Sequence, residues 1–233
     1  MFGLFAAGLD FCYHKGMSSI QLQTITAQLE TWAPLNLAAG WDNSGLQIGH
    51  PEQEVTDVLI AMDVDDAVLQ YIQGHPADLV ITHHPLFFKP IKQIRVGSDL
   101  ARSLTVFLNS GVQLYTMHTN LDAAPNGVTD ALIRAYGFDP MHAEALSEPY
   151  GKIVSVSPAL SIESLSHKFP ARLRGSQART TCNKIGFCGG SGGSFIEEAY
   201  AQGAECFITG EINYHQELFC QMNDMMCLEL GHK

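Results

Sequence analysis

The sequence has few basic side chains for its length of 233 residues. Lysine and arginine together number 13 against 24 aspartates and glutamates, which leaves a formal charge of −11 at pH 7. Proteins that bind nucleic acids in general neutralise the phosphates with clustered lysines and arginines. The shortage therefore argues against nucleic acid as a partner and favours small substrates or protein partners.

The sequence also lacks an apolar run long enough to cross a bilayer, so no membrane partner is expected. Its first sixteen residues are apolar as far as Tyr13, but they have no basic segment and no clear small-residue cleavage site, so they do not resemble a signal peptide. Ser18 or Ser19 looks like the cap of a helix. We therefore expect residues 1–16 to form an N-terminal extension outside the packed domain.

Paired cysteines are a third absence. None of the six cysteines belongs to a C-x-x-C motif, and four of them fall within predicted strands or helices. This arrangement is typical of buried, reduced thiols rather than of a disulfide framework. It predicts a cytoplasmic protein.

Hydrophobic periodicity divides the first half of the chain into alternating helices and strands. The predicted helices cover residues 18–32, 65–73, 98–109 and 128–136, and the predicted strands cover residues 55–62, 79–82 and 112–117. Such alternation implies an α/β fold with a mostly parallel sheet that is covered on both faces. Residues 17–137 are therefore predicted to form a first α/β lobe.

The pattern weakens over residues 138–180, where four prolines interrupt it and only residues 162–169 look helical. We expect this segment to be a connector, or else the beginning of the second lobe. The predicted strands beyond it cover residues 184–188, 205–209 and 226–230, and the predicted helices cover residues 195–202 and 214–222. Residues 181–233 are therefore predicted to form a second α/β lobe.

Two adjacent histidines, His83 and His84, follow the apolar run of residues 79–82 and precede a proline. Neighbouring side chains on an extended segment point to opposite faces, so the pair would suit two neighbouring metal ions better than one. A dinuclear metal site is our leading hypothesis here. Structural histidines in a metal-free α/β protein are the alternative.

Polar side chains follow the other predicted strands as well. These further clusters lie at residues 118–122, 189–194, 210–211 and 231–232. Open parallel sheets bind ligands at the carboxyl ends of their strands, so a site is expected at this edge. The imidazole of His118 and the carboxylate of Asp122 suit zinc, manganese, iron or a similar divalent ion. His118 and Glu211 are also our candidates for catalytic proton transfer.

Two segments could hold the anionic part of a substrate. The backbone N–H groups of Gly190, Ser191 and Gly192, in the run GGSGGS, could bind a phosphate or carboxylate, although a tight turn explains the glycines equally well. Lys89 and Lys92 belong to a local basic patch in an acidic chain, which suits an anionic substrate. A solvated loop is the alternative for the two lysines.

Six stretches resemble, in order, the motifs of the dinuclear-metal family named GTP cyclohydrolase 1 type 2, also called the Nif-three-like family. They lie at residues 41–49, 82–86, 118–122, 189–192, 208–211 and 231–232, and so span nearly the whole chain beyond Met17. The resemblance implies two intertwined α/β lobes with two divalent metal ions between them, and a cytoplasmic, toroidal homohexamer. It also implies the opening of the guanine ring of GTP to make formate and a dihydroneopterin-type product.

The same resemblance implies a set of metal ligands, namely His83, His84, Asp122 and His232, with His118 at the same cleft. The family motif places a further ligand glutamate four residues after the last of these histidines, whereas the sequence stops at Lys233. A bridging carboxylate screens the repulsion between two cations, so we expect its loss to weaken at least one of the two metal sites. The resemblance implies either that the second lobe, residues 181–233, is truncated at its C-terminus or that the chain is a degenerate member of the family.

Two functions are compatible with these residues. The first is a metal-dependent hydrolase, in which two ions lower the pKa of a bound water that attacks an anionic or nucleotide substrate. The second is a non-catalytic metal-binding protein that forms a ring and acts in regulation or interaction. We take the hydrolase as the leading interpretation.

Overall fold

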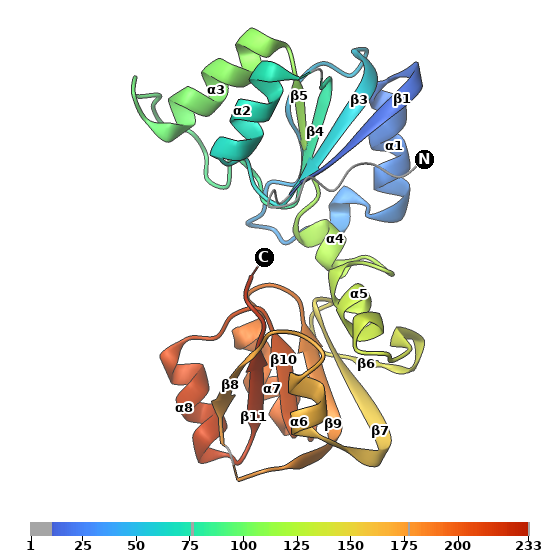
Figure 1. Cartoon of the computed structure of the whole chain (residues 1–233), viewed down its shortest axis with the longest axis vertical. Helices are drawn as coiled ribbons and strands as arrows, with labels where there is room; N and C mark the ends of the chain where they lie inside the picture. The colour runs from blue at the N-terminus through green and yellow to red at the C-terminus, as the bar shows by residue number, and fades with distance from the viewer. Residues whose placement is uncertain (1–10, 76, 177, 233) are drawn as a thin grey trace. The chain divides into compact units, whose positions relative to one another are not determined.

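The computed structural model describes residues 11–75, 77–176 and 178–232, and for residues 11–17 only the backbone. The chain divides into two compact units, Met1–Leu121 and Asp122–Lys233. Each unit is a mixed α/β structure built around its own sheet (Figure 1). In the part of the chain that the structure describes, no helix has the length and apolar character needed to span a membrane.

The first sheet has the strand order β1-β3-β4-β5-β2. Its strands are β1 (Phe11–Gln21), β2 (Gly45–Ile48), β3 (Glu54–Ala61), β4 (Leu79–Thr82) and β5 (Gln113–Thr116). The three central strands β3, β4 and β5 are parallel, whereas the edge strands β1 and β2 pair antiparallel to their neighbours. The prediction of a mostly parallel sheet was therefore correct only for the centre of this unit.

Helices α2 (Asp66–Gly74) and α3 (Asp99–Ser110) cover one face of this sheet (Figure 1). Both helices begin where the sequence predicted, because the side chains of Asp65 and Ser98 accept hydrogen bonds from the first turn. Helix α3 ends at Gly111, whose φ of 71° few other residues adopt readily. The remaining helical segments of the unit are α1 (Leu22–Trp32), the 3₁₀ turn η1 (Leu35–Leu37) and the start of α4 (Thr119–Ala123).

The second sheet has the order β6-β7-β9-β10-β11-β8. Its strands are β6 (Glu144–Ala145), β7 (Gly151–Ser161), β8 (Arg172–Gly175), β9 (Thr181–Cys188), β10 (Cys206–Thr209) and β11 (Met226–Glu229). The central strands β9, β10 and β11 are again parallel, and the outer pairings are antiparallel. The helical segments are α5 (Val128–Ala135), η2 (Pro140–His142), α6 (Ile162–Ser166), η3 (Gly192–Phe195), α7 (Ile196–Ala201) and α8 (Tyr214–Met222).

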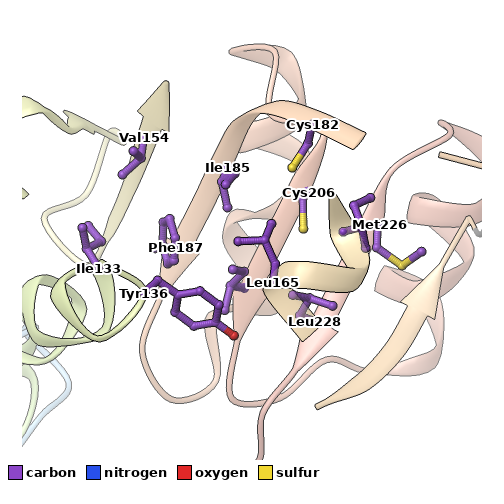
Figure 2. Packing of buried hydrophobic residues seen from close by; sticks show 12 residues of the cluster. Ile133, Tyr136, Val154, Leu165, Cys182, Ile185, Phe187, Cys206, Met226 and Leu228 are labelled. Atoms are coloured by element: carbon purple, nitrogen blue, oxygen red, sulfur yellow. The ribbon is translucent and has the colours of Figure 1, made fainter. Parts of the chain in front are cut away.

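Both faces of the second sheet are packed, because successive side chains of a strand point to opposite sides. On β10, Cys206 and Ile208 face a cluster that includes Tyr136, the residue after α5, and Leu165 of α6 (Figure 2). Between them, Phe207 points to the other cluster, against α7 and α8. Burial on both sides explains the continuous apolar sequence of this strand.

Three predictions are corrected by the backbone. Residues 18 and 19 lie within β1, at the irregularity between Lys15 and Ile20 in its pairing with β3, so they do not cap a helix. Helix α1 instead begins after Gln21 without a side-chain cap. Residues 11–16 of the predicted extension are also part of β1, whereas residues 1–10 lie outside the described part of the chain. The segment over residues 138–180, predicted as a connector or as the beginning of the second lobe, contains β7, which pairs with β9. It therefore belongs to the second sheet and is not a connector.

The predicted boundary between the lobes also shifts. The sequence predicts it after residue 137, because the helix over residues 128–136 continues the alternation of the first half. That helix, α5, instead packs through Ile133 against the second sheet, so the division falls after Leu121.

Candidate metal centre

Three histidines come together at the carboxyl edge of the first sheet. His83 and His84 follow β4, and His118 follows β5. Because β4 and β5 are adjacent and parallel, their carboxyl ends meet at one edge. One ring nitrogen of each histidine lies within 4.8 Å of the others, in a group that could hold a metal ion.

The vicinal pair reaches this common point because it is not extended. Strand β4 ends at Thr82, and His83 and His84 lie in a bend. Their ring centroids are 5.0 Å apart, and they lie 5.2 and 5.5 Å from the ring of His118. The expectation that the two side chains point to opposite faces was therefore wrong, since it assumed that the strand continued through them.

Each of these imidazoles has a defined acceptor at Nδ1. His83 Nδ1 lies 2.9 Å from the carbonyl oxygen of Met117, so this nitrogen must donate. His84 Nδ1 and His118 Nδ1 each lie 2.7 Å from a carboxylate oxygen, of Asp63 and Asp42 respectively. A donor bond from Nδ1 places the proton on that atom and the lone pair on Nε2, which is the form of histidine that binds a metal.

Asp42 is the buried acid of this centre, with no exposed side-chain surface. Burial raises the pKa of its carboxyl, but hydrogen bonds from His118, Thr119, Ser44 and the backbone N–H of Asn43 outweigh burial and lower that pKa to about 2. Asp42 is therefore ionised at neutral pH. Its two oxygens connect the loop before β2 with the segment after β5.

Asp42 and Asp63 were not predicted as site residues. Asp42 lies in the stretch 41–49 that resembles the family, and Asp63 follows the end of β3 by two residues. The rule that located the histidines, which looks for polar residues after parallel strands, applies to Asp63 too. It could have indicated this acid, but not which histidine the acid contacts.

In the second unit, the predicted residues gather at the ends of β9, β10 and β11. His232 Nδ1 lies 3.2 Å from a carboxylate oxygen of Glu211. A Cβ atom placed on Gly190 would lie 3.4 Å from His232 Nε2, so the glycine loop approaches this ring closely. Glu211, predicted to transfer protons, is thus in a position to orient His232.

The glycines of this loop are used for close packing. The N–H group of Gly192 donates to the Thr209 hydroxyl at 3.0 Å and to the carbonyl of Gly190 at 3.1 Å. A Cβ atom on Gly193 would lie 2.0 Å from Oε1 of Gln216. These contacts favour the tight-turn explanation of the loop, and phosphate binding at Gly190, Ser191 and Gly192 stays a prediction.

Asp122 lies in the same unit as His232. Burial, together with the charge of Asp122, raises the pKa of the Cys188 thiol to about 12, which places the carboxylate near the end of β9. Of the predicted site residues, the structure brings together His83, His84 and His118. The sequence predicted His118 as a catalytic residue and the other two as metal ligands. The roles of Asp122 and His232 as metal ligands stay predictions.

The lowered pKa of Asp42 predicts a specific loss of stability in acid. A folded-state pKa of about 2, against an ordinary value of 3.8, contributes about 2 kcal/mol that is present above pH 4 and is lost as the pH falls toward 2. Asp42→Asn removes this contribution, so between pH 5 and pH 2 the variant should lose about 2 kcal/mol less stability than the wild type. Urea unfolding followed by circular dichroism measures the difference.

Asp99→Asn is the matched control, because the side chain of Asp99 is 98% exposed. It should follow the wild-type dependence on pH. Equal pH dependences for Asp42→Asn and the wild type would show that the Asp42 carboxyl titrates as it does in the unfolded chain.

Known proteins share this architecture. The family model described as Duf34/NIF3 (NGG1p interacting factor 3) matches residues 20–233. A Clostridium perfringens protein named GTP cyclohydrolase 1 type 2 homolog is 29% identical over 227 residues, which cover 91% of this chain and 86% of that protein. Drosophila melanogaster NIF3-like protein 1 is 29% identical over 229 residues, which cover 92% and 77% respectively.

Two solved structures have a similar fold. Reduced HcgD from Methanocaldococcus jannaschii superposes with a TM-score of 0.79 at 24% identity, over 92% of this chain and 88% of its own. A Bacillus cereus protein related to NIF3 gives a TM-score of 0.80 at 20% identity, over 91% and 88%. The resemblance to the family is confirmed by the family model and the two relatives, and the chain belongs to the Duf34/NIF3 family.

Proposed function

We propose that the protein binds two divalent metal ions and acts as a hydrolase on an anionic or nucleotide substrate. The observation that carries this proposal is the group of three histidines, whose ring nitrogens lie within 4.8 Å of one another. Nδ1 of His83 donates to a carbonyl oxygen, and Nδ1 of His84 and of His118 each contacts a carboxylate. A histidine that binds a metal through one ring nitrogen usually makes such a contact with the other. Relatives named GTP cyclohydrolase 1 type 2 homolog agree with a hydrolytic role.

The proposed ligands are His83 and His84 from the first unit, and Asp122 and His232 from the second. The first two are supported by their geometry, and the other two by the resemblance of their motifs to the family. Imidazole and carboxylate together suit zinc, manganese or iron. Such ions, when bound, lower the pKa of a water molecule toward neutrality and polarise the bond that it attacks.

The protein's own side chains orient the ligands and move protons. Asp63 orients His84, and Glu211 orients His232. His118 is positioned by the ionised carboxylate of Asp42, and we propose that it transfers a proton to or from the substrate beside the metal ions. Lys89 and Lys92 are proposed to attract the anionic substrate.

We also propose, from the family resemblance, that the protein is a cytoplasmic homohexamer. The described cysteine side chains support a reducing compartment, because all are buried and none forms a disulfide; they are Cys182, Cys188, Cys206, Cys220 and Cys227. Light scattering on the purified protein should give about six times the chain mass of 25.4 kDa. A monomer or dimer mass would contradict the ring.

Metal content tests the ligand assignment. His84→Ala should remove at least one of two bound ions per chain, because an alanine offers no ligand atom. Asp63→Asn should keep the ligand but weaken binding by about 10- to 100-fold, because the imidazole loses its charged partner. Dialysis against graded chelator, followed by elemental analysis, measures both effects.

His142→Ala serves as the control, since the side chain of His142 is 83% exposed and lies outside the group of three histidines. It should retain the wild-type metal content. If His84→Ala also retained that content, the protein would bind its metal elsewhere or not at all.

Turnover separates the hydrolase from a non-catalytic metal-binding protein. The wild type reconstituted with manganese, zinc or iron should hydrolyse GTP or a member of a phosphoester panel. His118→Ala should lower kcat by about 10²- to 10⁴-fold, because a proton carrier is lost. Elemental analysis of the same variant separates this role from that of a third ligand in the group of three histidines, since loss of a ligand would also lower the metal content. Absence of turnover with every metal and substrate would leave the binding protein as the better description.

A further inference from the structure

A cavity of about 400 Å³ lies in the first unit next to the group of three histidines. It is lined by residues 41–43, from the loop before β2, and by residues 87–91, from the loop after β4. Its volume is within the range of about 300–1,000 Å³ that is common for small-molecule sites. Asp42, which contacts His118, belongs to its lining.

Two aromatic side chains form the walls of this cavity. The ring centroids of Trp41 and Phe88 are 5.6 Å apart, with 51° between the ring planes. Each ring also approaches His118, at 6.0 Å for Trp41 and 6.2 Å for Phe88. The aromatic walls therefore reach the edge of the metal centre.

These aromatic rings do not belong to the hydrophobic core. Trp41 is 62% exposed and Phe88 is 46% exposed, so much of their apolar surface faces solvent. A large apolar surface held open in this way is typical of binding sites.

The two loops are fastened to each other, which holds the rings in place. The side chain of Asn43 donates to the carbonyl of Phe87 at 2.7 Å, and the N–H group of Phe87 donates to the side chain of Gln47 at 3.0 Å. The backbone next to Trp41 is further held by Asp42, which accepts from both Ser44 and His118. A site with walls fixed before binding loses less entropy when a ligand enters.

The charge at the cavity favours an anion. Lys89 lines it, and residues 85–98 contain three basic side chains and no carboxylate, in a chain of charge −11. The Asp42 carboxylate also borders the cavity, but it has no exposed side-chain surface and is fully engaged with its donors. A ligand in this cavity would therefore meet one cation and two rings.

We propose that Trp41, Phe88 and Lys89 form the substrate-recognition subsite of the metal centre, and that it takes a flat aromatic or heteroaromatic ring that carries an anionic group. The ring packs against Trp41 and Phe88, and the anion lies at Lys89. This assignment rests on the proposed function only in naming the ligand as the substrate. Binding of a ring-bearing anion to the cavity does not itself require metal.

Calorimetric titration of the full-length protein tests the subsite with three probes, both before and after removal of metal by a chelator. The probes are 1-naphthylphosphonate, methylphosphonate, which lacks the ring, and 1-naphthol, which lacks the charge. The first should bind at least tenfold more tightly than either of the others. Trp41→Ala should weaken its binding about tenfold, because stacking is lost.

Matched variants separate recognition from folding. Trp41→Phe keeps a ring and should stay within about threefold of the wild-type affinity, and Trp32→Ala, which removes the other tryptophan away from the cavity, should match the wild type. Lys89→Ala should weaken binding of 1-naphthylphosphonate but not of 1-naphthol. Equal binding of the naphthyl and methyl phosphonates, or wild-type affinity in Trp41→Ala, would overturn the proposal.

Comparison of the titrations before and after chelation distinguishes failure of the subsite proposal from failure of the proposed function. If the protein holds no metal but still binds 1-naphthylphosphonate through Trp41, the subsite proposal is supported and the proposed hydrolase is contradicted. If the wild type holds metal but Trp41→Ala binds 1-naphthylphosphonate as tightly as the wild type does, the metal centre is supported and the subsite proposal is contradicted.

Discussion

The ionised carboxylate of Asp42 is the interaction on which the candidate site depends. A buried charge without partners costs several kcal/mol, so the carboxylate is stable only because side-chain and backbone donors surround it. Those donors come from two segments that are far apart in the chain, at Ser44 and at His118 and Thr119. The same contacts that satisfy the charge therefore hold the His118 ring beside the vicinal histidines.

The position of Asp42 has a consequence for its neighbours. Trp41 precedes it in the chain and Asn43 follows it, so the backbone on both sides is held by the same group of hydrogen bonds. Asn43 in turn contacts the carbonyl of Phe87, in the loop after β4. A single buried charge thus supports both the orientation of a histidine and the position of two exposed aromatic rings.

Both units use the same arrangement of strands and differ in what they place at the strand ends. In each, three parallel strands form the centre and antiparallel strands form the edges. The parallel centre brings loops from successive strands to one edge, which is why polar residues collect there. The first unit gathers three histidines, whereas the second unit pairs His232 with Glu211 beside a glycine-rich turn.

The sequence by itself determined the central strands, most helices and the histidines, because apolar runs, caps and strand-end polar residues are local signals. Helix α8 was predicted with the bounds Tyr214–Met222 that it has. The antiparallel strands β7 and β8 were missed, since Pro158 interrupts one and Arg172 and Arg174 occupy the other. Such strands are stabilised mainly by pairing with a partner strand, which the local sequence does not reveal.

Only the tertiary structure decided which acid contacts which histidine. Asp63 is 21 residues from His84, and Asp42 is 76 residues from His118. Separations of this size depend on how the strands are ordered in the sheet and on how the loops bend beyond them. Local sequence therefore identified the residues that can bind a metal, whereas the folded chain fixed their tautomers, their orientation and the aromatic cavity beside them.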